Sequence, residues 1–445
     1  MQPDTPPEVP SRQQGEEGAQ GHPRDLAGWL AYLEQLHSKP IDLGLERVRA
    51  VLDRLAPRRA VPVITIGGTN GKGSTTAYLE AILQAAGYRT GCYTSPHLLR
   101  YNERIRVAGR PASDDDIIAA FEQVEAVRGD TPLTYFEFGT LAALQHFEGC
   151  AVDVLLLEVG LGGRLDAVNV LDADCAIVTS VALDHMEFLG PDRESIAGEK
   201  AGIFRAGRPA VFGETDVPRR LQQHAEQLGV LLHTAGRDFR HESTPSQWNF
   251  HGPAGSLYAL PYPALRGAYQ LDNAACALAA LALLQTMLPV ALQHVRDGLV
   301  RVSLPGRLQV LPGRPVVILD VAHNPHAAGA LSRSLARMSG FRQTRLVLGM
   351  LHDKDIAGVV SLFGGLADAW YLSDLPPPRG AGAAEIAALL PGDAVVANHF
   401  REPGEALRAA LADAQEDDRI VVFGSFLTVA SAMQALGRTD WSCPS

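Results

Sequence analysis

The sequence contains no apolar run of about 18 residues, the length that a helix needs to cross a membrane, so no transmembrane segment is expected. Its N-terminal stretch is acidic and rich in proline, glutamine and glycine, without the apolar core of a signal peptide. The cysteines are odd in number and form no C-x-x-C pair, which favours buried free thiols in a reducing compartment over a disulfide framework. These absences predict a cytoplasmic protein with no membrane partner. The cysteines are Cys92, Cys150, Cys175, Cys276 and Cys443.

An excess of positive charge is also missing. The formal net charge is −11, which argues against nucleic-acid binding as the main function of the chain. Anionic ligands would therefore need a locally positive pocket. No repeat of short period is present, and 46% hydrophobic and 20% charged residues over 445 positions fit a globular protein of two or three domains.

What the sequence does contain is a glycine-rich turn between a strand and a helix. Residues 63–66 form the β-branched run of a strand packed on both faces, and a helix is predicted over 75–86. The intervening glycines allow positive φ, so several N–H groups can point into one hollow that suits a phosphate. Lys72 adds a positive charge for the β- and γ-phosphates, and the hydroxyls that follow can reach the phosphate or Mg²⁺. The predicted nucleotide-binding residues are Gly68, Thr69, Asn70, Gly71, Lys72, Gly73 and Ser74.

This turn departs from the standard phosphate-binding loop at two positions. That pattern has glycine six residues before the lysine, where this chain has Ile66, and Ser or Thr directly after the lysine, where it has Gly73. We therefore predict a variant loop with a shorter arch.

Polar side chains follow other predicted strands. Ser95 comes after a short strand over 91–94, Glu158 ends an apolar strand over 152–159, and His185 follows a strand over 176–181. The carboxyl ends of parallel strands face one ligand crevice, so these side chains can converge on the phosphate loop. Glu158 is well placed to hold Mg²⁺, which prefers oxygen ligands. The spacing alone is also compatible with a salt bridge at the end of a strand for Glu158. For His185 it is compatible with a core histidine whose hydrogen bonds are made within the protein. Lys200 fits a surface charge equally well.

The chain divides into three segments. Residues 1–23 are predicted to form a disordered tail. Residues 24–304 carry the phosphate loop and the strand–helix alternation of an α/β fold, and include a long alanine-rich helix predicted over 269–288. A hinge is predicted at Pro305-Gly306-Arg307. Residues 305–445 form a second, smaller α/β pattern whose first buried strand, 316–319, ends in Asp320, and a later strand is predicted over 394–397.

Several motifs together carry a family resemblance. They are Gly68-Thr69-Asn70-Gly71-Lys72-Gly73-Ser74, Tyr93-Thr94-Ser95-Pro96-His97-Leu98, Glu158-Val159-Gly160-Leu161-Gly162-Gly163-Arg164-Leu165-Asp166-Ala167, Asp184-His185, Glu199-Lys200-Ala201-Gly202, Pro305-Gly306-Arg307 and Asp320-Val321-Ala322-His323-Asn324-Pro325. In order and spacing, over about residues 25 to 435, they resemble the folylpolyglutamate synthetase branch of the Mur ligase superfamily. The resemblance implies a P-loop Mur-ligase-type central domain followed by a smaller Rossmann-like α/β C-terminal domain.

The resemblance also implies an ATP-dependent amide ligase and its site residues. Lys72 and the loop amides would bind the triphosphate. Ser95 and Glu158 would hold a first Mg²⁺, and His185 would help to hold a second. Lys200 resembles a family lysine that CO₂ carbamylates. The positions that would reach ATP from the helix, the hinge and the second domain are Asn273, Arg307, Asp320 and His323.

The acceptor is indicated by the stretch Thr134-Tyr135-Phe136-Glu137-Phe138, predicted to precede a helix that runs to about residue 146. It resembles the pterin-pocket wall of bifunctional bacterial members. There Phe136 would stack on the pterin, while Thr134 and Asp166 would contact it. The substrates that the resemblance implies are dihydropteroate, folates, L-glutamate and ATP. It also implies a monomer, the usual state of family members.

Three alternatives stay open at this stage. The chain could be a monofunctional polyglutamylase, or a cell-wall Mur-type ligase, although the segment before residue 67 is short for the extra domain that such an enzyme usually carries. The third is an inactive P-loop module that binds nucleotide, which the joint presence of Lys72, Glu158 and Lys200 disfavours.

Overall fold

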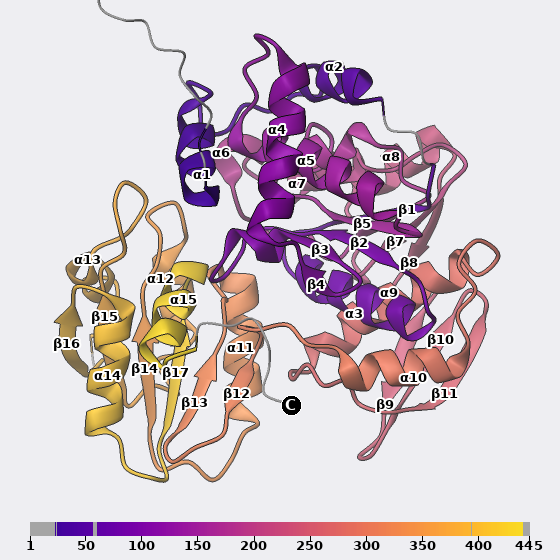
Figure 1. Cartoon of the computed structure of the whole chain (residues 1–445). Helices are drawn as coiled ribbons and strands as arrows, with labels where there is room; N and C mark the ends of the chain where they lie inside the picture. The colour runs from indigo at the N-terminus through magenta and orange to yellow at the C-terminus, as the bar shows by residue number, and fades with distance from the viewer. Residues whose placement is uncertain (1–22, 24, 57–59, 393, 439–445) are drawn as a thin grey trace, which may run out of the picture.

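The computed structural model describes residues 23, 25–56, 60–392 and 394–438. The predicted tail, except Pro23, lies outside the described residues, and so does Cys443. Figure 1 shows two α/β bodies next to each other. Among the described residues, no helix has the length and apolarity that a membrane span requires.

The first body is built on an eight-stranded sheet in the order β4-β3-β2-β5-β1-β6-β7-β8. Its strands β2, β5, β1, β6, β7 and β8 pair in parallel, whereas β3 and β4 pair antiparallel at one edge. The strands are β1 (Val63–Gly67), β2 (Thr90–Tyr93), β3 (Ile105–Val107), β4 (Arg110–Pro111), β5 (Val154–Glu158), β6 (Cys175–Val178), β7 (Pro209–Phe212) and β8 (Leu231–Thr234).

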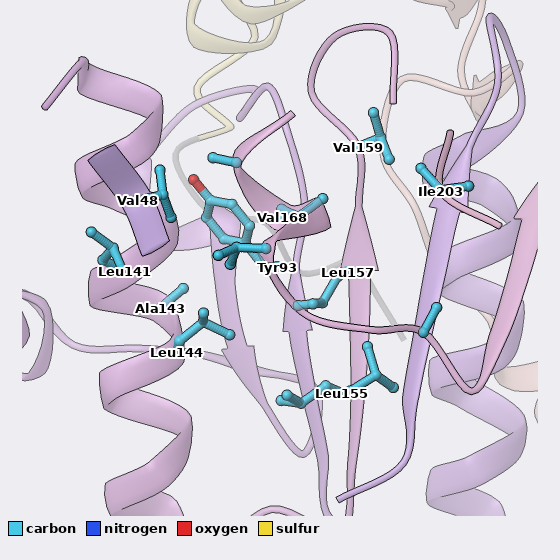
Figure 2. Close-up of a cluster of buried hydrophobic side chains, with 14 of the residues drawn as sticks. Val48, Tyr93, Leu141, Ala143, Leu144, Leu155, Leu157, Val159, Val168 and Ile203 are labelled. Atoms are coloured by element: carbon cyan, nitrogen blue, oxygen red, sulfur yellow. The ribbon is translucent and has the colours of Figure 1, made fainter. Parts of the chain in front are cut away.

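Both faces of this sheet are covered. Every residue of β1 and β5 is buried, as the sequence of the first strand predicts for a strand packed on two sides. Leu141 and Leu144 of one covering helix belong to the same buried apolar cluster as Leu155 and Leu157 of β5, and Figure 2 shows Tyr93 between that helix and β5. The helices of this body are α1 (Leu26–Gln35), α2 (Glu46–Leu55), α3 (Lys72–Ala85), α4 (Asp114–Arg128), α5 (Tyr135–Cys150), α6 (Met186–Leu189), α7 (Arg193–Ala201), α8 (Arg219–Leu228), α9 (Tyr269–Leu283) and α10 (Leu292–Arg301), with 3-10 turns η1 (Tyr101–Arg104) and η2 (Ala167–Val170).

The second body has a six-stranded sheet in the order β12-β13-β17-β14-β15-β16, parallel except for β12. Its strands are β12 (Gln309–Leu311), β13 (Val316–Leu319), β14 (Thr344–Leu348), β15 (Ala369–Ser373), β16 (Val396–Phe400) and β17 (Arg419–Phe423), and its helices are α11 (Pro325–Ala336), α12 (Ile356–Ser361), α13 (Ala383–Ala387), α14 (Pro403–Asp413) and α15 (Phe426–Ala435). One apolar cluster lies on each face of the sheet. The two-domain α/β class predicted from the sequence is confirmed.

The structure corrects four local predictions. Residues 135–138 do not precede a helix, because α5 begins at Tyr135, with Thr134 as its cap. The helix predicted over 269–288 ends at Leu283. The strand predicted over 394–397 lies at 396–400, and the helix predicted from residue 75 begins at Lys72. A separate antiparallel sheet, β9 (Arg240–Ser243), β10 (Trp248–Gly252) and β11 (Gly255–Leu260), was not predicted, because its strands are short and β9 is polar throughout.

Candidate active site

The predicted nucleotide and metal residues line one cleft at the carboxyl edge of the first sheet. β1, β2, β5 and β6 run in parallel, so the turns that follow them meet at the same edge. The second domain closes the other side of the cleft. The predicted residues that line it are Gly68 to Ser74, Ser95, Glu158, His185, Lys200, Asn273, Arg307, Asp320 and His323. Of the predicted set, Thr134, Phe136 and Asp166 do not belong to this lining.

The phosphate loop is held tightly against β6. Gly68 has φ +138° and Gly71 has φ +89°, and a Cβ at either position would collide with Thr179 or Asn273 respectively. The backbone N–H of Thr69 donates to the Ser180 carbonyl at 2.8 Å. These glycines therefore fix the arch of the loop both by their conformation and by the space available.

Lys72 is the first residue of α3 and folds back over the loop. Its Nζ donates to the carbonyls of Gly68 at 3.0 Å and Thr69 at 3.2 Å. Burial lowers the pKa of Lys72, while the nearby Glu158 carboxylate opposes that shift. A buried ammonium at the helix N-terminus favours an anionic ligand at this point.

Ser95 and Glu158 lie side by side at the ends of β2 and β5. The Ser95 N–H approaches Glu158 Oε2 at 3.4 Å. Burial raises the pKa of Glu158, and the positive charges of Lys72 and Arg307 counteract this rise. The carboxylate is 5% exposed and lies close to the loop glycine Gly73. A carboxylate and a hydroxyl are ligands that Mg²⁺ accepts, with phosphate oxygens and water completing its shell.

The loop that carries Ser95 is shaped by Glu103, which sequence reasoning did not single out. Its carboxylate accepts from the N–H groups of Leu98, Leu99 and Arg100, each at 2.7 Å. Three charge-assisted bonds to consecutive amides fix the path of the loop, and with it the position of Ser95.

Among the described residues, no group of three or more His, Cys, Asp and Glu side chains could hold a metal ion. Mg²⁺ does not require such a group, because it commonly combines one or two protein oxygens with substrate phosphates and water. The oxygens of Ser95 and Glu158 fit such a shared site, because the triphosphate would lie on the adjoining loop.

His185 lies in a charged cluster that spans the two domains. Its neighbour Asp184 accepts from Lys354 of the second domain, with Nζ to Oδ1 at 2.6 Å. Burial alone would raise the pKa of Asp184, but the Lys354 ammonium holds it well below the usual range. Burial, assisted by the Lys354 charge, lowers the pKa of His185 to about 4, so its imidazole is neutral at pH 7, and its Nε2 lies 3.4 Å from Lys354 Nζ.

Lys354 was not predicted from the sequence. The only signal was the charged run Asp353-Lys354-Asp355 soon after a buried strand, and nothing in that pattern pairs Lys354 with a residue 170 positions away.

Lys200 is 4% exposed in the last turn of α7. Burial, together with the charge of Lys72, lowers the pKa of Lys200 to about 7. A substantial share of this amine is therefore uncharged near neutral pH, which is the form that reacts with CO₂. The surface-charge interpretation of Lys200 is excluded by its burial.

The second domain contributes Asp320 and His323, and the hinge contributes Arg307. Asp320 accepts from the N–H groups of Leu308 at 2.7 Å and Ala322 at 2.8 Å, and burial raises its pKa. His323 Nδ1 lies 2.8 Å from the Val321 carbonyl, so Nδ1 carries the proton, and Nε2 lies 3.8 Å from Asp184 Oδ2. The Arg307 guanidinium lies over the Phe426 ring at 5.1 Å.

The residues predicted to line a pterin pocket lie beside this cleft. The Phe136 ring covers Gly160, a cleft residue, and lies 5.7 Å from the Tyr93 ring. Asp166 accepts from the Leu161 N–H at 2.8 Å, and burial raises the pKa of Asp166 to about 6. Thr134 caps α5 and its hydroxyl accepts from the Glu137 N–H. Phe136 is half-buried, so a face of its ring can receive a ligand.

A nucleotide loop facing a second α/β domain across a hinge is the arrangement of a Mur-type ligase. The Mur ligase middle domain model matches residues 66–281, and the model of the Mur ligase glutamate ligase domain matches residues 306–426. The chain belongs to the dihydrofolate synthase/folylpolyglutamate synthase family within that class.

Two kinds of relative support this placement. The "Dihydrofolate synthase/folylpolyglutamate synthase" of Escherichia coli (strain K12) is 48% identical over 412 residues, covering 92% of this chain and 95% of the relative. The solved structure "E.coli FolC in complex with DHPP and ADP" has a TM-score of 0.89 at 48% identity and covers 93% of this chain and 98% of that one. A "bifunctional folylpolyglutamate synthase/dihydrofolate synthase with Mn, AMPPNP and L-Glutamate bound" has a TM-score of 0.86 at 48% identity, with 93% and 98% covered.

Proposed function

We propose that this chain is an ATP-dependent amide ligase that joins L-glutamate to dihydropteroate, forming dihydrofolate, and also to the γ-carboxylate of folates. The observation that carries the proposal is the cleft in which the phosphate loop, Glu158 and the second-domain residues Asp320 and His323 face one another. The ligands named for similar structures, DHPP, ADP, AMPPNP and L-glutamate, are the substrates and nucleotides that such a reaction uses.

The first chemical step is attack of the acceptor carboxylate on the γ-phosphate of ATP. A bond forms between the carboxylate oxygen and phosphorus, ADP leaves, and the product is an acyl phosphate. Lys72 and the N–H groups of the loop hold the phosphates and offset the charge that develops on them. Arg307, half-buried at the hinge with its guanidinium close to Gly73, adds a second positive charge.

Ser95 and Glu158 would hold one Mg²⁺ with the phosphates, and neutral His185 would contribute to a second site. Bound Mg²⁺ supplies charge neutralisation at the phosphate oxygens. Ser95 and Glu158 determine where the positive charge of Mg²⁺ would lie, because Glu103 constrains the loop that carries Ser95 and β5 constrains Glu158.

We infer that CO₂ carbamylates Lys200. The neutral amine attacks the carbon of CO₂, an N–C bond forms and a proton leaves, which gives an anionic carbamate. The carbamate places an anionic oxygen ligand near Lys72, where the protonated amine of Lys200 would place a positive charge. The pKa of about 7 supports this inference, because burial keeps much of the amine uncharged.

In the second step the amine of L-glutamate attacks the acyl carbon and phosphate leaves. The acyl phosphate must be kept from water until that attack. Residues of both domains surround the cleft, and the chain passes between the domains at Pro305-Gly306-Arg307, so closure about this hinge can exclude water.

The pterin of the acceptor would lie against Phe136, with Asp166 at its polar edge. Phe136 covers Gly160, so a ring stacked there is within reach of the cleft at the end of β5. Thr134 contributes by capping α5, which holds Phe136 in place. We further propose that the enzyme acts as a cytoplasmic monomer, with neither nucleic acid nor membrane as a partner.

Oxygen transfer tests the proposed chemistry. Dihydropteroate labelled with ¹⁸O in its carboxylate is incubated with ATP, Mg²⁺ and L-glutamate, and the released phosphate is examined by mass spectrometry. The acyl phosphate route places one labelled oxygen in each phosphate that accompanies an amide. Amide formation with unlabelled phosphate would refute it.

A further inference from the structure

We propose that Asn324 is a positioning residue for this reaction: it fixes the second domain on the phosphate loop so that the acyl phosphate is shielded from water. The proposal rests on the ligase function above. Asn324 lies at the N-terminus of α11, the helix on the side of the second domain that faces the first (Figure 1). Asn324 has no predicted role beyond its place in the motif Asp320-Val321-Ala322-His323-Asn324-Pro325.

The Asn324 side chain makes all four hydrogen bonds that an amide can make, and it is 2% exposed. Its Oδ1 accepts from the Ala327 N–H at 2.9 Å and from Asn70 Nδ2 at 3.1 Å. Its Nδ2 donates to Asn70 Oδ1 and to Asp184 Oδ2, each at 3.1 Å. One bond therefore caps its own helix, and the other three cross to the first domain.

The partner amide belongs to the phosphate loop itself. The backbone of Asn70 is anchored to β6, because its N–H donates to Ser180 Oγ at 3.0 Å and its carbonyl accepts from Thr179 Oγ1 at 2.6 Å. Its side chain points the other way, to Asn324 and to His326 Nδ1 at 2.9 Å. The described contacts of the Asn70 side chain thus join the loop to the second domain.

The third bond that crosses to the first domain connects Asn324 to the charged cluster around Asp184. Asp184 accepts from Lys354 of the second domain at 2.6 Å, and both side chains are less than 10% exposed. A buried carboxylate keeps its pairing only while its remaining oxygen is also satisfied. The Asn324 amide provides that donor, so the two links between the domains support each other.

Loss of these links would affect the chemistry through His323 and Asp320, which precede Asn324 in the same segment. They reach the cleft only if that segment stays against the first domain. When it moves away, the acyl phosphate meets water and hydrolyses, and ATP is consumed without amide formation.

A purely structural role as helix cap makes a different prediction, and Asn324→Asp separates the two. Aspartate caps a helix as well as asparagine does. It has no N–H to give Asn70 or Asp184, and it places a second carboxylate beside Asp184. Asp355→Ala is the matched control: Asp355 caps α12 in the same domain through the Gly358 N–H at 2.8 Å, and its described side-chain contacts do not cross to the first domain.

The test has two measurements on the full chain. The first is the ratio of phosphate released to amide formed with saturating ATP, L-glutamate and dihydropteroate. We expect a ratio near one for wild type and Asp355→Ala, and a several-fold higher ratio for Asn324→Asp. The second is small-angle X-ray scattering with a non-hydrolysable ATP analogue, in which Asn324→Asp should show a larger radius of gyration than wild type.

A wild-type ratio together with a wild-type radius in Asn324→Asp would overturn the proposal. Should that variant fail to fold, Asn70→Asp removes the other half of the pair, the donation from Asn70 Nδ2 to Asn324 Oδ1, without touching a helix cap, and must give the same two changes. The scattering measurement of the radius of gyration does not depend on enzyme turnover. If wild type formed no amide, the proposed function would fail while the effect of Asn324 on domain position would still be measured.

Discussion

Replacement of Phe136 by alanine should weaken dihydropteroate binding selectively. The ring is half-buried and packs against the main apolar cluster of the first domain, 5.7 Å from the Tyr93 ring and directly over Gly160. Its removal therefore lowers the stability of the free protein, and in addition a bound pterin loses its stacking partner. Base-on-aromatic stacking is worth about 1–3 kcal/mol by alanine substitution. That corresponds to a KM for dihydropteroate raised roughly 5- to 150-fold.

The assay is steady-state amide formation with dihydropteroate varied at saturating ATP and L-glutamate, followed by the same series with ATP varied. Phe138→Ala is the matched control, because Phe138 lies two residues away on the same helix but is fully buried, 5.5 Å from the Phe121 ring. That substitution should cost about 3–5 kcal/mol of stability and lower Tm without a selective effect on one substrate. An unchanged KM for dihydropteroate in Phe136→Ala, or an equal rise in the KM for ATP, would refute the assignment of the pterin pocket.

Three further predictions concern the nucleotide loop and Lys200. Lys72→Ala should lower kcat by about 10²–10³-fold at an unchanged fold, as judged by circular dichroism, because a preorganised charge at the phosphates is lost. Gly71→Ala should raise the KM for ATP, since φ is +89° and the added Cβ would meet Asn273; Gly87→Ala, at φ +91° with open space around it, should lower Tm alone. Carbamylation of Lys200, followed by ¹³C NMR with labelled bicarbonate, should rise with pH, because burial lowers the pKa to about 7 and only the neutral amine reacts. About a tenth of the amine is neutral at pH 6 and about nine-tenths at pH 8, so a flat profile would contradict the shift.

The sequence was sufficient to predict the cleft wherever the signal was local. The phosphate loop could be recognised because glycines, lysine and hydroxyls follow one another within a few residues. Ser95 and Glu158 could be placed because each ends a strand-like run, and parallel strands bring such ends together. Family resemblance added Lys200 and the second-domain residues, and all of them line the cleft.

What could not be predicted depends on contacts between distant segments. The bond from Asn70 to Asn324 joins residues 254 positions apart, and Lys354 meets Asp184 across the domain boundary. Neither pairing leaves a periodic pattern in the sequence. Glu103 was overlooked for a different reason: its three backbone partners follow from the path of a loop, which residue types alone do not specify.

The most direct test of the account compares two acceptors. Amide formation is measured with ATP and L-glutamate, using 7,8-dihydropteroate in one series and tetrahydrofolate in the other, for wild type and Lys72→Ala. The account predicts turnover with both acceptors and its loss in the variant. Turnover with tetrahydrofolate alone would restrict the enzyme to polyglutamylation and contradict the pterin assignment of Phe136. No turnover with either acceptor would contradict the proposed function as a whole.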